Sequence, residues 1–169
     1  MSLTFVLGGA RSGKTALALR EALAHPATRR VMIATAEALD GEMAERIARH
    51  RAERGADWVT VEAPRRLADA VADLADGDVA VIDCLTLWIT NLLMDQADVG
   101  AAMAELVTAL AASPAELIVI SNEVGQGIVP DNALARRFRD EAGWAHQAVA
   151  AAADRVVFVT AGLGRVLKG

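Results

Sequence analysis

The chain has 169 residues, of which 54% are hydrophobic, and its length is enough for one domain over residues 1–169 with a continuous buried core. Its formal net charge of −5 at pH 7 argues against a nucleic-acid partner, and its apolar runs are too short to span a membrane. The single cysteine, Cys84, excludes an internal disulfide, and no signal peptide precedes the first apolar run, so we expect a cytoplasmic protein.

The first elements of the chain enclose a glycine-rich loop. Residues 3–7 form a short apolar run typical of a buried strand, and residues 16–23 have the composition of a helix. Between them the sequence follows the pattern G-x-x-x-x-G-K-T of a phosphate-binding loop. The loop consists of Gly8, Gly9, Ala10, Arg11, Ser12, Gly13, Lys14 and Thr15. We expect every one of these residues to contact a nucleoside triphosphate.

Each part of this loop has a physical role in phosphate binding. Glycines let successive backbone N–H groups point inward at phosphate oxygens, and the following helix directs its positive end at the same anion. Lys14 would reach the β- and γ-phosphates, and the Thr15 hydroxyl would bind Mg²⁺. The alternative is a glycine-rich turn that only happens to precede a helix. The ordered succession of strand, loop, Lys-Thr pair and helix favours the nucleotide site.

Strands and helices alternate along the rest of the chain. We expect further strands at residues 30–35, 58–62, 78–83, 117–120 and 155–160, and helices at 42–54, 65–74, 85–94, 100–112 and 132–152. We predict no element for the tail after residue 160. The strands are apolar throughout, which indicates an α/β protein of the P-loop (RecA-like) type, with a mostly parallel sheet and helices on both faces.

In this architecture ligands bind beyond the carboxyl ends of the strands. Asp83 follows four apolar residues, which is the form of a Walker B acid that would hold Mg²⁺ opposite Thr15. The alternative is an acid that caps the next helix. Asn122 and Glu123 follow another strand, and Glu123 is a candidate for a metal or water contact or else an ordinary loop acid.

The expected helix at 42–54 contains a histidine between cations. Arg46 and Arg54 lie one turn from His50 on the same side of that helix. The simplest interpretation is an amphipathic helix with a solvated charged edge. Neighbouring cations also disfavour protonation of the imidazole, and a neutral imidazole can attack phosphorus. The spacing permits both interpretations.

An ordered set of motifs, spread over nearly the whole chain, is more specific than the phosphate loop alone. They are G-G-A-R-S-G-K-T at 8–15, I-A-T at 33–35, E-M-x-x-R-I-x-x-H at 42–50, W-x-T-x-E at 58–62, D-C-L-T-L-W at 83–88, T-N-L-L at 90–93 and S-N-E-V-G-x-G-I-V-P at 121–130. Arg136, Phe138-Arg139-Asp140, Gly143 and Gly162-Leu163 continue the pattern. The set resembles the bifunctional adenosylcobinamide kinase/adenosylcobinamide-phosphate guanylyltransferase family of cobalamin synthesis.

The resemblance implies two reactions and their partners. A nucleoside triphosphate, ATP or GTP, gives its γ-phosphoryl group to the aminopropanol hydroxyl of adenosylcobinamide. GTP then guanylylates a histidine, and the GMP moves to adenosylcobinamide phosphate to give adenosylcobinamide-GDP. Mg²⁺ is the implied cofactor, and family members form homo-oligomers, in the best-known case trimers.

The resemblance also assigns residues. The histidine nucleophile falls on His50, so this assignment replaces the simpler interpretation of that helix. Beyond the phosphate loop, the nucleotide site falls on Thr35, Ala36, Glu37, Arg51, Ala52, Glu53, Arg54, Glu62 and Asp83. Glu62 further suggests a hypothesis, since a carboxylate accepts hydrogen bonds from the N–H edge of guanine, which adenine does not present in the same way.

Other functions remain open at this stage. A simple small-molecule kinase would use Lys14 and Asp83 without a covalent intermediate. A GTP-binding switch protein would read guanine with an N-K-x-D motif, which this sequence lacks. A motor-like ATPase would turn over slowly without cobinamide and would need a partner surface.

Overall fold

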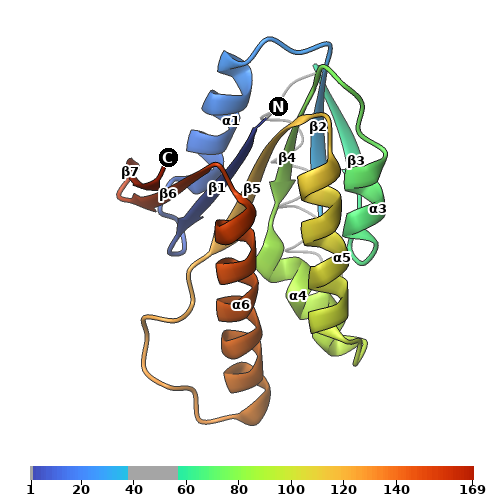
Figure 1. Ribbon diagram of the computed structural model, residues 1–169. Coiled ribbons are helices and arrows are strands. Elements are labelled where there is room, and N and C mark those ends of the chain that lie inside the picture. Colours follow the sequence, from blue (N-terminus) through green and yellow to red (C-terminus); the bar gives the residue numbers. More distant parts are fainter. Residues whose placement is uncertain (1, 38–56) are drawn as a thin grey trace.

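The computed structural model describes residues 2–37 and 57–169, which form a seven-stranded sheet with helices on both faces (Figure 1). The order of the strands across the sheet is β3-β2-β4-β5-β1-β6-β7. Their bounds are β1 Leu3–Gly8, β2 Arg29–Ala34, β3 Trp58–Glu62, β4 Asp78–Asp83, β5 Glu116–Asn122, β6 Arg155–Thr160 and β7 Leu163–Lys168. Strands β1 to β6 pair in parallel, so the predicted mostly parallel sheet is confirmed.

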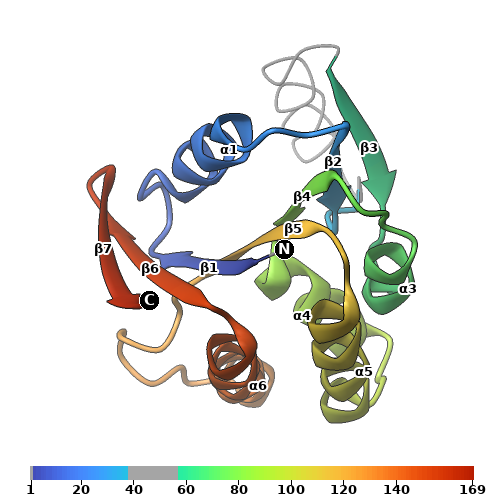
Figure 2. The same cartoon turned by 45° about the horizontal axis from the view of Figure 1, so that its top comes forward.

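The helices of the described residues divide unequally between the two faces of the sheet. The described helices are α1 Lys14–Ala24, α3 Leu67–Ala72, α4 Leu85–Met94, α5 Val99–Ala112 and α6 Ala133–Ala152. Helix α1 covers one face, and α3, α4, α5 and α6 cover the other (Figure 2). The helix expected at 42–54 lies outside the described residues.

Side chains alternate along each strand between two hydrophobic cores, because successive residues of a strand point to opposite faces. In β1, Phe5 belongs to the core beneath α3 to α6, whereas Val6 belongs to the core beneath α1. Both side chains are fully buried. The apolar runs seen in the sequence therefore reflect a sheet that is covered on both sides.

The chain after residue 160 forms an element that the sequence did not predict. Strand β7 pairs antiparallel with β6 across a tight turn at Ala161 and Gly162. Both turn residues are left-handed, with φ of 52° and 79°, as a two-residue hairpin turn requires. An Ala-Gly pair is a weak signal for such a turn, and every residue of β7 is exposed, so no apolar alternation marked the strand.

Two further boundaries differ from expectation in informative ways. Helix α3 is shorter than the predicted helix at 65–74, because Arg66 at its N-cap has the non-helical angles φ −87° and ψ 58°. Strand β5 is longer than predicted and ends at Asn122, which lies beside Gly8 of β1. The carboxyl ends of β1, β4 and β5 thus bring three polar segments to one edge of the sheet.

Candidate nucleotide and phosphate site

The phosphate loop connects β1 to α1, and its backbone requires glycine at two positions. Gly13 has φ 97°, a left-handed conformation that most side chains avoid. At Gly8 a Cβ atom would lie only 2.4 Å from the carbonyl oxygen of Val159 and 2.6 Å from Ser12 Oγ. The loop therefore packs against strand β6 more closely than any side chain would allow.

Two backbone hydrogen bonds hold the loop from opposite sides. The N–H of Gly162, in the β6–β7 turn, donates to the carbonyl oxygen of Ser12 at 2.8 Å. The N–H of Glu123, directly after β5, donates to the carbonyl oxygen of Gly8 at 2.9 Å. These bonds fix the loop before a ligand binds, which lowers the ordering cost of binding.

Lys14 lies in the loop as the sequence predicted, and its side chain already folds back over it. Its ammonium Nζ donates to the carbonyl oxygen of Gly9 at 2.7 Å and lies 3.5 Å from Ser12 Oγ. Burial lowers the pKa of Lys14, and the nearby Cys84 and Asp83 act in the opposite direction. A buried cation held by a neutral carbonyl is well suited to exchange that partner for a phosphate oxygen.

Thr15 and Asp83 supply oxygen atoms close to this lysine. Thr15 is the second residue of α1, and Asp83 is the last residue of β4, with both side chains partly buried. Within residues 2–37 and 57–169, no group of three or more His, Cys, Asp or Glu side chains is arranged to hold a metal ion. A hydroxyl and one carboxylate instead fit Mg²⁺, which keeps several waters and takes further oxygens from phosphates.

A polar network lies behind the loop, between the ends of β4 and β5. Asn122 Nδ2 donates to Thr86 Oγ1 at 3.2 Å, and Cys84 Sγ lies 3.3 Å from the same hydroxyl. Burial raises the pKa of the Cys84 thiol, so the group stays neutral beside Asp83. The network ties Asn122 to the Walker B strand.

Thr35 lies at the end of β2, but its hydroxyl is used within the fold. Thr35 Oγ1 donates to the carbonyl oxygen of Cys84 at 2.8 Å and accepts from the Cys84 N–H at 2.9 Å. Asn91 Nδ2 donates to the carbonyl oxygens of Thr35 at 2.8 Å and Pro64 at 2.9 Å. These contacts join β2, β4 and α4 at the carboxyl edge.

Glu37 follows two residues later and pairs with Arg65, which no sequence motif marks as part of the site. Arg65 forms ion pairs with both Glu37 and Asp95. The hydrogen bond to Asp95, and then the one to Glu37, raise the pKa of the Arg65 guanidinium, which stays charged. Twenty-seven residues separate Glu37 from Arg65, and 29 separate Arg65 from Asp95, so no local sequence pattern indicated this cluster.

The remaining predicted residues divide into two groups. Ala36 lies between Thr35 and Glu37 after β2, and Glu62 ends β3 with an exposed side chain. The structure thus brings the loop, Asp83 and the ends of β2 and β3 to one edge of the sheet. The predicted residues His50, Arg51, Ala52, Glu53 and Arg54 lie outside the described residues, as does Arg46.

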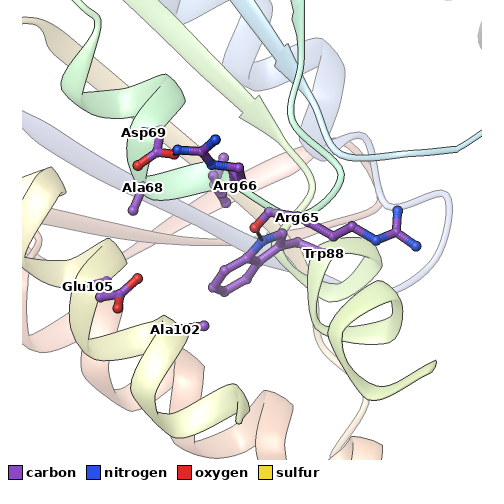
Figure 3. Close-up of a pocket in the computed structure, with 8 residues that line it drawn as sticks. Arg65, Arg66, Ala68, Asp69, Trp88, Ala102 and Glu105 are labelled. Atoms are coloured by element: carbon purple, nitrogen blue, oxygen red, sulfur yellow. Dashed lines mark hydrogen bonds and ion pairs between the residues drawn. The ribbon is translucent and has the colours of Figure 1, made fainter. Parts of the chain in front are cut away.

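A hollow of about 260 Å³ lies between α3, α4 and α5 (Figure 3). Trp88 lines it and donates its Nε1–H to the carbonyl oxygen of Arg65 at 2.7 Å. Arg66 is paired with Asp69, and the Arg65 side chain points away from the hollow. Because its cations are paired or turned away, we assign this hollow no part in the chemistry.

The sheet order, the loop and the acid at the end of β4 define a P-loop NTPase fold, and solved structures bear this out. The chain superposes on the RadB recombinase with a TM-score of 0.56 at 16% identity, covering 93% of this chain and 73% of that one. It superposes on the flagellar accessory protein FlaH of Methanocaldococcus jannaschii with a TM-score of 0.53 at 15% identity, covering 99% and 78%. These likenesses concern the fold alone.

Sequence comparison narrows the class to a family. Residues 4–167 match the model of the family described as cobinamide kinase / cobinamide phosphate guanyltransferase. The chain is 48% identical to the bifunctional adenosylcobalamin biosynthesis protein CobP of Pseudomonas aeruginosa, over 97% of this chain and 96% of that protein. It is 42% identical to CobU of Salmonella typhimurium, over 98% and 99%. The chain belongs to this family, as its motifs predicted.

Proposed function

We propose that the protein catalyses two successive steps in cobalamin biosynthesis. It phosphorylates adenosylcobinamide with a nucleoside triphosphate, and it then transfers GMP from GTP to the new phosphate through a guanylylated histidine. The observation that carries this proposal is the family match over residues 4–167, joined to a phosphate loop whose lysine and Walker B acid lie together.

In the kinase step the loop acts by position and charge. The backbone N–H groups of the loop and the Lys14 ammonium hold the β- and γ-phosphates, and Thr15 and Asp83 would hold Mg²⁺. The metal would neutralise charge that develops on the phosphates during transfer. Lys14 needs only to leave the Gly9 carbonyl, because its ammonium is already buried within the loop.

In the guanylyl transfer step His50 is the proposed nucleophile. Its imidazole nitrogen attacks the α-phosphorus of GTP, pyrophosphate leaves, and the phosphate of the first product later takes the GMP. Arg51 and Arg54 are proposed to neutralise phosphate charge, with Ala52 and Glu53 beside them in the nucleotide site.

Glu62 is the proposed reader of guanine. Its position at the end of β3 places it on the ligand-binding edge of the sheet, where a carboxylate would accept hydrogen bonds from the guanine N–H groups. Replacing Glu62 with Gln is then expected to weaken the use of GTP more than the use of ATP. Equal losses with both nucleotides would count against this role.

The experiment that tests the whole proposal uses GTP labelled at the α-phosphate, with Mg²⁺. The parent protein should acquire an acid-labile label, and His50→Ala should acquire none. Label that persists in the variant would move the nucleophile elsewhere. A parent that acquires no label but phosphorylates cobinamide would favour the simple kinase.

Two further properties belong to the same proposal. We expect homo-oligomers, as trimers, which sedimentation of the purified protein would test. We expect a cytoplasmic location, in keeping with a single, buried thiol. Among the described helices, none is long and apolar enough to cross a membrane.

A further inference from the structure

A hollow of about 370 Å³ opens beside the phosphate loop and extends beyond it to residues that have no predicted role in nucleotide binding. Its lining comes from three segments: the first half of the loop, the chain after β5, and the β6–β7 hairpin. The lining residues are Gly9, Ala10, Arg11, Ser12, Glu123, Gln126, Phe158, Val159, Thr160 and Ala161. We propose that this hollow binds the hydroxyl-bearing arm of the phosphoryl acceptor, a proposal that rests on the kinase function proposed above.

The hollow lies at the end of the loop where the γ-phosphate belongs. Lys14 is the loop residue that reaches the β- and γ-phosphates, and its Nζ lies 2.7 Å from the carbonyl oxygen of Gly9. Gly9 is also the first residue of the hollow's lining. The nucleoside extends the other way, because the α-phosphate is the one that connects to it. A ligand in the hollow therefore meets the transferable phosphoryl group.

Glu123 places a carboxylate at the same point. Its backbone N–H donates to the carbonyl oxygen of Gly8, which fixes the residue against the start of the loop. Its Oε1 accepts from the Gly125 N–H at 2.6 Å, so the carboxylate is oriented as well as anchored. Its other oxygen is left for a donor on the ligand. A hydroxyl group next to the γ-phosphorus is such a donor.

Two other polar groups of the lining suit an amide-bearing ligand, and Arg11 adds a cation on the side of the phosphate loop. Gln126 and Thr160 are exposed and can donate to or accept from primary amides, and the Phe158 ring adds apolar surface. At about 30 Å³ per water-sized group, the hollow holds about a dozen heavy atoms. That is room for an aminopropanol arm and a neighbouring amide, and the macrocycle would remain outside.

Phosphoryl transfer in this site requires only the acceptor hydroxyl and the nucleoside triphosphate as reactants. The acceptor oxygen forms a bond to the γ-phosphorus, and the bond from that phosphorus to the β,γ-bridging oxygen breaks. The nucleoside diphosphate leaves with the bridging oxygen. The hydroxyl proton passes to the Glu123 carboxylate and from there to water.

The test distinguishes effects on binding of the acceptor from effects on binding of the nucleotide. Guanylylation of the protein by GTP requires no acceptor, so it serves as an internal control. Glu123→Gln should lower the kcat of the kinase step about 10²–10³-fold, because a positioned base contributes about that much. Gln126→Ala should raise the KM for cobinamide about tenfold, as the loss of one or two hydrogen bonds predicts. Neither variant should change the KM for ATP or the labelling by GTP.

The matched control is Gln147→Ala, because Gln147 is also an exposed glutamine but lies on α6 away from the hollow. It should leave both reactions unchanged. If Gln126→Ala weakens ATP as much as cobinamide, the hollow belongs to the nucleotide and the proposal is wrong. An unchanged KM for cobinamide in an active variant overturns the site alone, whereas a parent without kinase activity overturns the proposed function as well.

Discussion

Replacing Thr35 with valine tests whether the residue's hydroxyl serves the fold. Valine has nearly the same shape as threonine but lacks its hydroxyl. Thr35 is fully buried, and its hydroxyl exchanges two hydrogen bonds with the backbone of Cys84, at 2.8 and 2.9 Å. The Cys84 carbonyl oxygen keeps a second partner in the Trp88 N–H at 3.3 Å, but the Cys84 N–H loses the acceptor that Thr35 supplies.

The expected cost follows from these bonds. Two hydrogen bonds contribute about 0.5–1 kcal/mol each, and a stranded buried N–H costs about 1–2 kcal/mol more. Thr35→Val should therefore lower the free energy of unfolding by about 2–4 kcal/mol. With an m-value of about 2 kcal/mol/M, the urea midpoint would fall by about 1–2 M. The affinity of the folded variant for GTP should change less than about threefold, because the hydroxyl faces Cys84.

The matched control is Thr108→Val, which removes a hydroxyl that bonds the Ala104 carbonyl oxygen on the exposed side of α5. Its effect should stay within about 0.5 kcal/mol. Urea titrations followed by circular dichroism measure both variants. A loss of stability for Thr35→Val no larger than that of Thr108→Val would refute the structural role. A large loss of GTP affinity with little loss of stability would place the hydroxyl in the nucleotide site instead.

Three further changes have definite expectations. Lys14→Met should lower kcat/KM of the kinase step about 10²–10³-fold without loss of stability in urea, because burial already disfavours the charged ammonium. Gly8→Ala should abolish nucleotide binding in calorimetry and cost at least about 1–3 kcal/mol of stability, because the new Cβ meets the Val159 carbonyl oxygen; normal binding would contradict the close packing. Burial lowers the pKa of His146, so the unfolded chain binds more protons, and stability should fall as the pH drops below about 6.5 toward the folded pKa. His146→Asn should show a smaller decrease over that pH range, and an unchanged slope would assign it to other groups.

The sequence predicted the parallel strands well because their burial on both faces leaves continuous apolar runs. Strand β4 was predicted with its observed bounds, since acids mark both ends of its apolar interior. The phosphate loop was also predictable, because local backbone geometry requires glycine at particular positions of the loop. At Gly13 that geometry is a positive φ, and at Gly8 it is close packing against β6.

Long-range contacts between polar groups could not be predicted in the same way. The ion pairs of Arg65 with Glu37 and Asp95 join the chain after β2 to the end of α4, and neither pair has a periodic signature. A ligand contact was predicted for Thr35 from its place after a strand, but only the fold shows that its hydroxyl is hydrogen-bonded to the backbone of Cys84. Strand β7 was missed because an exposed edge strand carries no buried face to record in its sequence.

The two backbone hydrogen bonds that hold the phosphate loop limit the ways in which one site could serve two reactions. The Gly8 carbonyl is bonded to the chain after β5, and the Ser12 carbonyl is bonded to the β6–β7 turn, so the first half of the loop has little freedom to move. Different phosphorus atoms of the nucleotide must then be reached by different attacking groups around a fixed triphosphate, since a held loop cannot carry the nucleotide between them. On this view the acceptor arm approaches the γ-phosphorus from the Glu123 side, and the guanylyl acceptor must approach the α-phosphorus from elsewhere. Glu123→Gln should accordingly impair the first reaction and leave labelling by GTP intact, and a parallel loss of both reactions would contradict separate approaches to the nucleotide.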